Sequence, residues 1–167
     1  MILYSHRGNI NGRTPELENT PGYIDKALAS DFSVEVDLWC KDKKFFLGHD
    51  VPQTEVSYKW LIDRREKLVI HAKNFEAFGL LTYQHLNRNE ELCVFFHEKE
   101  KYALVHNCRN SHGIIVEGVI WAHCLDEINS KSIIPLLTSE DVTNHFPTRQ
   151  VWGICSDYIA DISNIAR

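Results

Sequence analysis

The sequence predicts a single α/β domain whose parallel strands form a closed or nearly closed barrel, with lost or shortened helices in its second half. Up to about residue 97, short apolar segments alternate with helical patterns, as in parallel strands joined by crossover helices. Beyond that point apolar segments still recur, but the gaps between them are too short for full crossover helices throughout. No linker, repeat or low-complexity tract divides the 167 residues, so we expect one domain over 1–167.

The first predicted elements are a strand and a helix. Residues 2–5 are an apolar segment that stops at a polar cluster, as a buried strand does. Thr20 and Pro21 are typical of a helix N-cap and first helical position, and apolar residues then recur at helical spacing over 21–30. We expect a loop between these two elements, because residues 8–15 carry two glycines and a proline.

Residues 33–39 alternate between apolar and polar side chains, which predicts a strand with Glu35 and Asp37 on one face. Further strands are expected at 44–47, 68–73, 92–96, 114–116, 133–137 and 151–155. Helices are expected at 57–66, at 75–86 with Asn74 as its cap, and at 139–145 with Ser139 as its cap.

Charge and cysteine content exclude several classes of protein. Lys and Arg number 18 against 23 Asp and Glu, which gives a formal charge of −5 and argues against a nucleic-acid binder or a polybasic membrane anchor. The apolar runs are far shorter than the roughly 20 residues that a membrane-spanning helix needs, so we expect no membrane insertion. Five scattered cysteines without a C-x-x-C pair, and no visible secretory signal, favour reduced thiols and a cytoplasmic location.

Three polar clusters follow predicted strands, at residues 5–9, 35–37 and 48–50. The carboxyl ends of parallel strands meet at one end of such a fold, so these clusters are expected to converge there. Glu35 and Asp37 stand on one strand face with backbones about 6.6 Å apart, close enough to share a divalent cation. The alternative is that this face is exposed and both acids are solvated.

His6 and His49 each end a predicted strand segment beside a charged residue, Arg7 and Asp50 respectively. Phosphodiester cleavage needs one group that takes a proton from the nucleophile and another that returns a proton to the leaving oxygen. Histidine titrates in the range that suits both tasks. We therefore expect the two histidines to act as an acid/base pair, with Asp50 orienting the imidazole beside it.

These segments resemble the glycerophosphodiester phosphodiesterase family, within the phospholipase-C-like phosphodiesterase superfamily of TIM barrels. S-H-R-G-N at 5–9, E-N-T at 18–20, V-E-V-D-L at 34–38 and L-G-H-D at 47–50 match the family pattern H-R-G, P-E-N-T, E-x-D and H-D in order and approximate spacing. G-I-C-S-D at 153–157 is similar to the family's closing strand. The resemblance covers residues 1–50 closely and the remainder loosely.

The resemblance implies a phosphoric diester hydrolase on a small, partly reduced TIM barrel. It would cleave a glycerophosphodiester or a related alcohol phosphodiester, either a small molecule or a polymer. Carried over by position, His6 and His49 would be the catalytic pair, Arg7 would hold a phosphate oxygen, and Glu35 and Asp37 would bind Mg²⁺ or Ca²⁺.

Several further residues are assigned to the site on the same basis or by their position. Glu18 and Asn19 stand where the family keeps supporting polar residues. Trp39 shares the strand face of the two acids and is expected to line the substrate pocket. Lys73 matches the family's lysine and is expected to contact the phosphate or to pair with an acid. Asp157 matches the Asp that ends the family's closing strand.

The chain departs from the family at two points. In the family segment I-E-x-K the acid is a third metal ligand, whereas here His71 takes its place before Lys73. If His71 is a ligand, Mn²⁺ and Zn²⁺ become candidates beside Mg²⁺ and Ca²⁺; the alternative is that it has no ligand role. The chain is also shorter than a typical TIM barrel of about 250 residues, so the rim that selects the alcohol should be minimal.

Two other functions remain open at this point. A non-catalytic module that binds a phosphate ester or sugar phosphate would explain His71, although it would have no evident need for both His6 and His49. A lyase that releases a cyclic phosphate would use the same residues as the hydrolase. A zinc site at the spacing C-x-x-x-H is disfavoured, because Cys93 and His97 on a strand would be about 13 Å apart.

Overall fold

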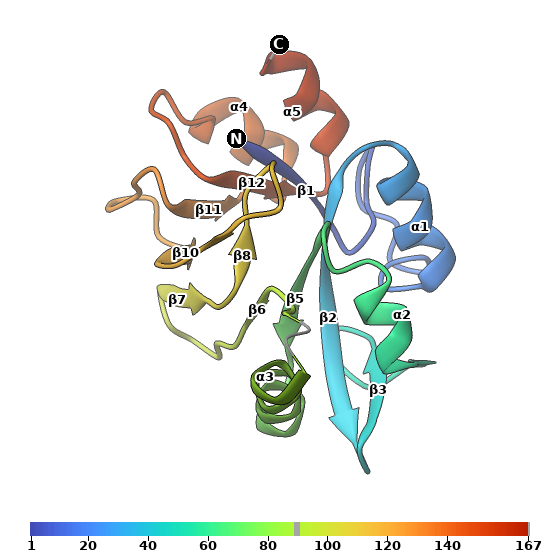
Figure 1. The fold of residues 1–167 in the computed structure, drawn as a ribbon. Helices are drawn as coiled ribbons and strands as arrows, with labels where there is room; N and C mark the ends of the chain where they lie inside the picture. Colours follow the sequence, from blue (N-terminus) through green and yellow to red (C-terminus); the bar gives the residue numbers. More distant parts are fainter. Residues whose placement is uncertain (89–90, 167) are drawn as a thin grey trace.

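The computed structural model describes residues 1–88 and 91–166 and shows a mixed α/β fold with a central, mostly parallel sheet and few helices (Figure 1). The strands are β1 (Ile2–His6), β2 (Ser33–Lys41), β3 (Lys44–Leu47), β4 (Thr54–Val56), β5 (Leu68–Ala72), β6 (Val94–Phe95), β7 (Tyr102–Val105), β8 (Cys108–Arg109), β9 (Ile115–Val116), β10 (Val119–Ala122), β11 (Ser132–Pro135) and β12 (Gly153–Ser156). The helices are α1 (Pro21–Ala29), α2 (Tyr58–Ile62), α3 (Phe75–Arg88), α4 (Ser139–His145) and α5 (Ile159–Ile165).

Parallel pairing runs through most of the main sheet, from β6 through β5, β2, β1, β12 and β11 to β10. β7 pairs with β10 in antiparallel orientation. β3 pairs in antiparallel orientation with the C-terminal part of β2, and β4 pairs in the same way with β3. An isolated antiparallel bridge links Val94 in β6 to His106, the residue after β7. The predicted parallel α/β sheet is confirmed, while the closed TIM barrel stays a prediction.

Apolar side chains pack on both faces of the sheet. One cluster lies between β2, β3, β5 and helices α1 to α3, and another lies between β10 to β12 and helices α4 and α5. A third cluster collects buried side chains of β1, β5 to β7 and β10 to β12 on the other face of the sheet, among them Tyr4, Phe95, Trp121 and Cys155. In Figure 1 the helices lie on the outer face of the strands. The third cluster, on the other face, contains no helix residue and is formed by side chains of the strands and their loops.

The elements predicted up to residue 88 are confirmed, with small shifts at their ends. Thr20 is the N-cap of α1 as predicted, but its hydroxyl donates to the Leu17 carbonyl at 2.7 Å instead of capping the helix. The Asn74 side chain does cap α3, since its Oδ1 accepts from the Ala77 amide at 3.0 Å. The short β4 was not predicted, because its three residues carry no clear alternation.

Predictions for the second half were less complete. The segment predicted at 114–116 is β9, which pairs with β8 in a separate two-stranded sheet instead of joining the main sheet. β7, β10 and α5 were not predicted, because each is too short for its pattern to stand out from a loop. The expected shortening of helices is confirmed, since α4 and α5 each have seven residues. None of the described helices has the length and apolarity needed to cross a bilayer.

The N-cap of α4 is Thr138, so the prediction of Ser139 was wrong by one residue. Thr138 Oγ1 accepts from the Asp141 amide at 3.0 Å, and Asp141 Oδ2 accepts from the Thr138 amide at 2.9 Å, which completes a capping box. Partial burial raises the pKa of Asp141, but the Thr138 hydrogen bonds outweigh it and leave that pKa below its ordinary value. The stabilisation from this carboxylate is therefore present above the ordinary Asp pKa and is lost on acidification.

We expect Thr138→Ala to lower the free energy of unfolding by about 1 kcal/mol, because it leaves the Asp141 amide without its cap. Urea denaturation measures this change. Ser139→Ala is the matched control, since no side-chain hydrogen bond of Ser139 occurs among the described residues, and it should change stability by less than about 0.5 kcal/mol. Equal losses in the two variants would contradict the assignment of the cap.

Candidate active site

A cavity of about 500 Å³ opens at the carboxyl ends of the parallel strands. The residues that line it lie on or just after β1, β2, β3, β5, β6, β10 and β11: His6, Arg7, Glu35, His49, His71, Lys73, Phe95, His97, Glu98, Trp121, His123, Pro135 and Leu137. This is the end of the sheet at which the sequence predicted the polar clusters to converge. His6 and His49, predicted as a pair from distant segments, line the same cavity.

His6 is held by an aspartate from the other end of the chain. β1 and β12 are paired in parallel, which sets Asp157 beside His6 where the two strands end. His6 Nδ1 lies 2.7 Å from Asp157 Oδ1, and its Nε2 lies 3.9 Å from Glu35 Oε2. Asn9 donates to Asp157 at 2.7 Å and to Glu18 at 3.1 Å. Asp157 therefore fixes the imidazole orientation and leaves Nε2 toward Glu35.

The chain turns sharply after β1, and the turn aims Arg7 at the acids of β2. Arg7 adopts a left-handed conformation with φ of 55°, and Gly8 follows with φ of 95°. A Cβ on Gly8 would lie 2.7 Å from Tyr23 Cδ1, so glycine is required there. Arg7 Nε lies 2.8 Å from Asp37 Oδ2, and its Nη1 donates to Glu18 Oε2 at 3.2 Å.

Asp37 is fully buried and surrounded by donors. Its Oδ1 lies 3.0 Å from His71 Nδ1 and 3.3 Å from Lys73 Nζ. Its Oδ2 accepts from Asn19 Nδ2 at 3.0 Å, while Arg7 Nε lies 2.8 Å from the same oxygen. Burial alone would raise the pKa of Asp37, but the His71 hydrogen bond and the two cations lower it well below its usual range. Asp37 is thus an ionised carboxylate that joins β2 to β5 and to the loop after β1.

Glu35 lies two residues away in a different environment. It is buried, and its Oε2 has no hydrogen-bond partner among the described residues. Burial, followed by repulsion from Asp37, raises the pKa of Glu35 above its ordinary value, although the charges of His6 and Arg7 oppose the shift. The possibility that this strand face is exposed is therefore wrong, and the two neighbouring carboxyls differ in the protonation that they favour.

Glu35, Asp37 and His71 form a group that could hold a metal ion, with one ligand atom from each lying within 4.8 Å of the others. Because Asp37 lies against His71 Nδ1, a proton on that nitrogen leaves the lone pair of Nε2 free. His71 Nε2 and Glu35 Oε2 are both buried without partners, as ligand atoms of an absent ion would be. Two carboxyls and an imidazole are ligand types that divalent cations bind in proteins, so the donor set fits a divalent cation.

A second tight turn carries His49. Gly48 has φ of 145°, and a Cβ there would collide with the Val51 carbonyl oxygen. Trp39 Nε1 donates to the Gly48 carbonyl at 2.7 Å and so anchors the loop. Trp39 was expected to line the substrate pocket, but it does not belong to the cavity lining. Through this hydrogen bond to Gly48, Trp39 helps to position His49, which follows Gly48 in the loop.

The His49 imidazole pairs with its neighbour, as the sequence predicted. His49 Nδ1 lies 2.7 Å from Asp50 Oδ1. The Asp50 side chain is exposed, whereas His49 is part-buried at the cavity. Burial, followed by the nearby Arg7 charge, lowers the pKa of His49 below its ordinary value. The uncharged imidazole is therefore favoured near neutral pH, and His49 contrasts with the enclosed His6 in its access to solvent.

Sequence reasoning missed part of the site. Trp121 and His123 line the cavity but were not proposed, because β10 was not recognised as a strand and its place beside β11 is a long-range pairing. His97 also lines the cavity, and Asp157, matched only to the family's closing strand, contacts His6.

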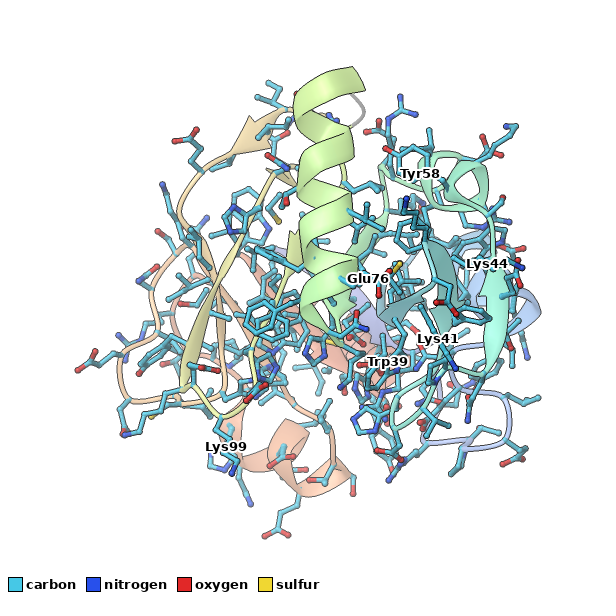
Figure 2. All side chains as sticks on the ribbon, turned by 90° about the horizontal axis from the view of Figure 1, so that it is seen from below. Trp39, Lys41, Lys44, Tyr58, Glu76 and Lys99 are labelled. Atoms are coloured by element: carbon cyan, nitrogen blue, oxygen red, sulfur yellow. The ribbon has the colours of Figure 1, made fainter. Side chains whose placement is uncertain are left out.

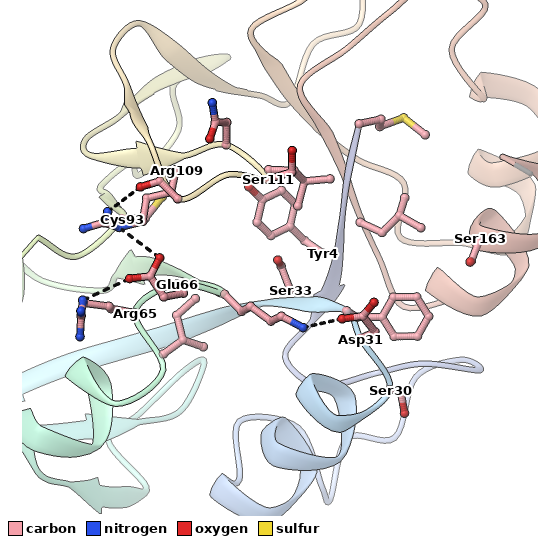
Figure 3. A pocket seen from close by; sticks show the side chains of 18 residues that line it. Tyr4, Ser30, Asp31, Ser33, Arg65, Glu66, Cys93, Arg109, Ser111 and Ser163 are labelled. Carbon is pink, nitrogen blue, oxygen red and sulfur yellow. Dashed lines mark hydrogen bonds and ion pairs between the residues drawn. The ribbon is translucent and has the colours of Figure 1, made fainter.

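A larger cavity of about 640 Å³ lies at the opposite end of the sheet (Figure 3). It is lined by the beginnings of β1, β2 and β5 and by the β8 hairpin. Its lining cations are paired with acids: Lys67 with Asp31 at 2.6 Å, and Arg109 with Glu91 at 2.9 Å. Cys93 lines this cavity whereas His97 lines the other, so the two cannot share a zinc ion.

Comparison of the chain with protein-family models, with curated proteins and with solved structures found no match.

The two acids of β2 should respond oppositely to neutralisation. Asp37→Asn removes the carboxylate that pairs with Lys73 and leaves Arg7 only its Glu18 partner, so it should lower the free energy of unfolding by about 3–5 kcal/mol. Glu35→Gln removes a buried carboxyl that resists ionisation, so in chelator at pH 7 it should be at least as stable as wild type. Urea denaturation measures both.

The pH dependence supplies the control. The folded state raises the pKa of Glu35, so its ionisation opposes folding above the ordinary value of 4.5. Below that pH the carboxyl is protonated in both states, and wild type and Glu35→Gln should converge in stability. A Glu35→Gln variant that is strongly destabilised at pH 7 would refute this electrostatic description.

Replacement of His71 tests its position toward a cation. His71→Glu adds a hard oxygen donor and a charge, so it should tighten Ca²⁺ or Mg²⁺ binding by about tenfold or more relative to wild type. Isothermal titration calorimetry with the metal alone measures the affinity. His112→Glu adds the same charge on an exposed turn and should leave binding unchanged. Identical titrations of wild type and His71→Glu would place this side chain away from the ion.

Proposed function

We propose that this chain is a metal-dependent phosphodiesterase that cleaves a glycerophosphodiester or a related alcohol phosphodiester. The observation that carries the proposal is the cavity at the carboxyl end of the sheet. Two imidazoles with carboxylate partners, His6 and His49, line it together with two cations, Arg7 and Lys73. These are the groups that acid/base cleavage of a phosphodiester requires.

The proposal includes a small, partly reduced TIM barrel. The main sheet ends at β6 on one side and, beyond the parallel strand β10, at the antiparallel strand β7 on the other. Val94 of β6 and His106 after β7 exchange two backbone hydrogen bonds of 2.8 and 3.1 Å, which supports closure at this point. The inward cluster of Tyr4, Phe95 and Trp121 supports a filled interior, as small barrels have.

His6 is the proposed general base. Asp157 lies at 2.7 Å from its Nδ1 and would stabilise the imidazolium that forms when Nε2 takes a proton. The proton comes from the attacking group, which is a water or a hydroxyl of the substrate itself. Attack by a substrate hydroxyl would release a cyclic phosphate, so the same residues serve a lyase and a hydrolase.

His49 is the proposed general acid. It returns a proton to the oxygen of the leaving alcohol. Because the pKa of His49 is lowered, the protonated form that acts as the acid is the minor one near neutral pH, and the solvent-facing loop lets the imidazole be reprotonated between turnovers. Asp50 holds its Nδ1 at 2.7 Å and so directs Nε2 away from that contact. Gly48 and Trp39 fix the loop that presents the imidazole.

Arg7 and Lys73 are the proposed phosphate ligands. Both line the cavity, and Asp37 holds them in place through ion pairs of 2.8 and 3.3 Å. Glu35, Asp37 and His71 would hold the cation. A bound divalent ion, Mg²⁺ or Ca²⁺ by resemblance and Mn²⁺ or Zn²⁺ by the imidazole ligand, supplies positive charge to the phosphoryl oxygens. Glu18 and Asn19 support Arg7 and Asp37 from the loop after β1.

Cleavage of bis(p-nitrophenyl) phosphate tests the proposal. We expect turnover that is abolished by chelator and reduced roughly 10²- to 10⁴-fold by His6→Ala or by His49→Ala. His145→Ala, an exposed histidine of α4, is the matched control and should keep wild-type turnover. Circular dichroism verifies that each variant is folded.

The outcomes separate the proposal from its alternatives. Wild-type turnover in both the His6 and the His49 variants would refute the acid/base assignment. A folded protein that binds a phosphate ester but never cleaves a diester would be the non-catalytic binding module. If glycerophosphodiesters are cleaved, identification of the phosphorus product as a cyclic or an acyclic phosphate distinguishes lyase from hydrolase.

A further inference from the structure

Two of the five cysteines lie against each other in the core. Cys93, just before β6, and Cys108, in β8, belong to the same buried cluster, and both are free thiols. The two thiols hydrogen-bond to one another. Tyr4 Oη lies 3.8 Å from Cys108 Sγ. The proposed acid/base chemistry and the proposed cation site use neither of these cysteines.

The other three thiols have different surroundings. Cys40 Sγ donates to Oε1 of Glu76 in α3 at 3.5 Å (Figure 2), and Cys124 Sγ donates to Asp126 Oδ2 at 3.2 Å. Cys155 is fully buried and lines neither of the two large cavities. Cys93 and Cys108 therefore form a thiol pair, whereas Cys40 and Cys124 contact carboxylates.

A bulge in the backbone brings the two thiols together. Val94 and His106 form the isolated antiparallel bridge, with backbone hydrogen bonds of 3.1 and 2.8 Å. Regular alternation from that bridge would turn Asn107 inward and Cys108 away from the core. Asn107 is instead left-handed, with φ of 56°, so the alternation shifts by one residue. Cys108 is consequently buried beside Cys93.

This placement suits a disulfide. The position next to a hydrogen-bonded antiparallel pair is the closely spaced one, where opposed Cα atoms lie about 4.5 Å apart. Disulfides join residues whose Cα atoms lie roughly 4.4–6.8 Å apart. Because the Cys93 and Cys108 thiols already hydrogen-bond across this position, their sulfur atoms need little movement to bond.

The pair can be reached from the cavity of about 640 Å³ at the end of the sheet opposite the candidate active site. Cys93 is 5% exposed and lines this cavity (Figure 3). Hydrogen bonds from Cys93 and Tyr4 lower the pKa of Cys108 despite its burial, while burial and Cys108 raise the pKa of Cys93. One sulfur thus favours the nucleophilic thiolate, and its neighbour faces the cavity.

We propose that Cys93 and Cys108 are a dithiol oxidation site, at which hydrogen peroxide converts the two thiols into a disulfide. One sulfur takes an oxygen atom from the peroxide: the O–O bond breaks, an S–O bond forms, and the first water leaves. The other sulfur then displaces that oxygen, which leaves with the second thiol proton as water, and the S–S bond forms. The two thiols lose two electrons, and the peroxide is reduced to two waters.

The disulfide would reinforce a weak seam in the fold. Among the described residues, β6 and β7 are joined only by the isolated bridge of Val94 and His106, and the thiol pair lies next to it. A covalent link at this point restricts the unfolded chain and so stabilises the folded protein. The inference is independent of the proposed phosphodiesterase function.

Peroxide treatment of the folded protein tests the site. In a Cys124→Ser background, which removes the most accessible of the five thiols, the number of free thiols should fall from four to two. Peptide mapping without reductant should find Cys93 linked to Cys108. The Tm should rise by about 5 °C or more, and dithiothreitol should reverse both changes.

Matched variants in the same background supply the controls. Cys93→Ala should form no disulfide within the chain and show no rise in Tm, whereas Cys40→Ala should still form the Cys93–Cys108 link. Wild type supplies a test that does not depend on any variant being folded. If peroxide oxidises Cys124 fully in wild type and leaves Cys93 and Cys108 unlinked, or if the linked protein has an unchanged or lower Tm, the proposal is overturned.

Discussion

The carboxylate of Asp37 is the interaction on which the rest of the site depends. It is buried on β2, and both of its oxygens are engaged: one by His71 and Lys73 of the β5 segment, the other by Arg7 and Asn19 of the loop after β1. Three segments far apart in the chain therefore meet at one charge. Because ionised groups this well enclosed must be matched by partners, the strand register and the loop conformation are constrained together.

The loops that carry the charged groups are held by backbone geometry as well as by that charge. Gly8 and Gly48 adopt positive φ at positions where a Cβ would collide with neighbouring atoms. Arg7 itself is left-handed, a conformation that costs free energy and persists because its ion pairs fix it. The result is a set of side chains placed at strand ends and on short rigid turns, which suits a site that must hold several groups at fixed separations.

Local patterns were enough to predict the first half of the fold and most of the acidic part of the site. Alternation along β2 set Glu35 and Asp37 on one buried face, and the strand-end position of His6 was evident. The place of Trp121 in the cavity was not predictable in the same way. Trp121 reaches the cavity because β10 pairs with β11. β10 has only four residues, and their sequence does not indicate which strand they pair with. Likewise Asp157 was suspected from the closing motif, but its contact with His6 follows from parallel pairing across the whole chain.

The charge distribution of the cavity explains why a carboxylate and an imidazole can remain without partners there. Arg7 and Lys73 both pair with Asp37, so burial and the repulsion from Asp37 outweigh the partial compensation of Glu35 by Arg7, and the pKa of Glu35 is raised. A third acid in place of His71 would add repulsion to an already crowded pair of carboxyls. A neutral imidazole avoids that cost and still offers Nε2, at the expense of one hard oxygen ligand. At the proposed cation site, His71 would therefore lower the affinity for hard cations and raise the stability of the metal-free protein relative to an acid, and this favours a borderline metal.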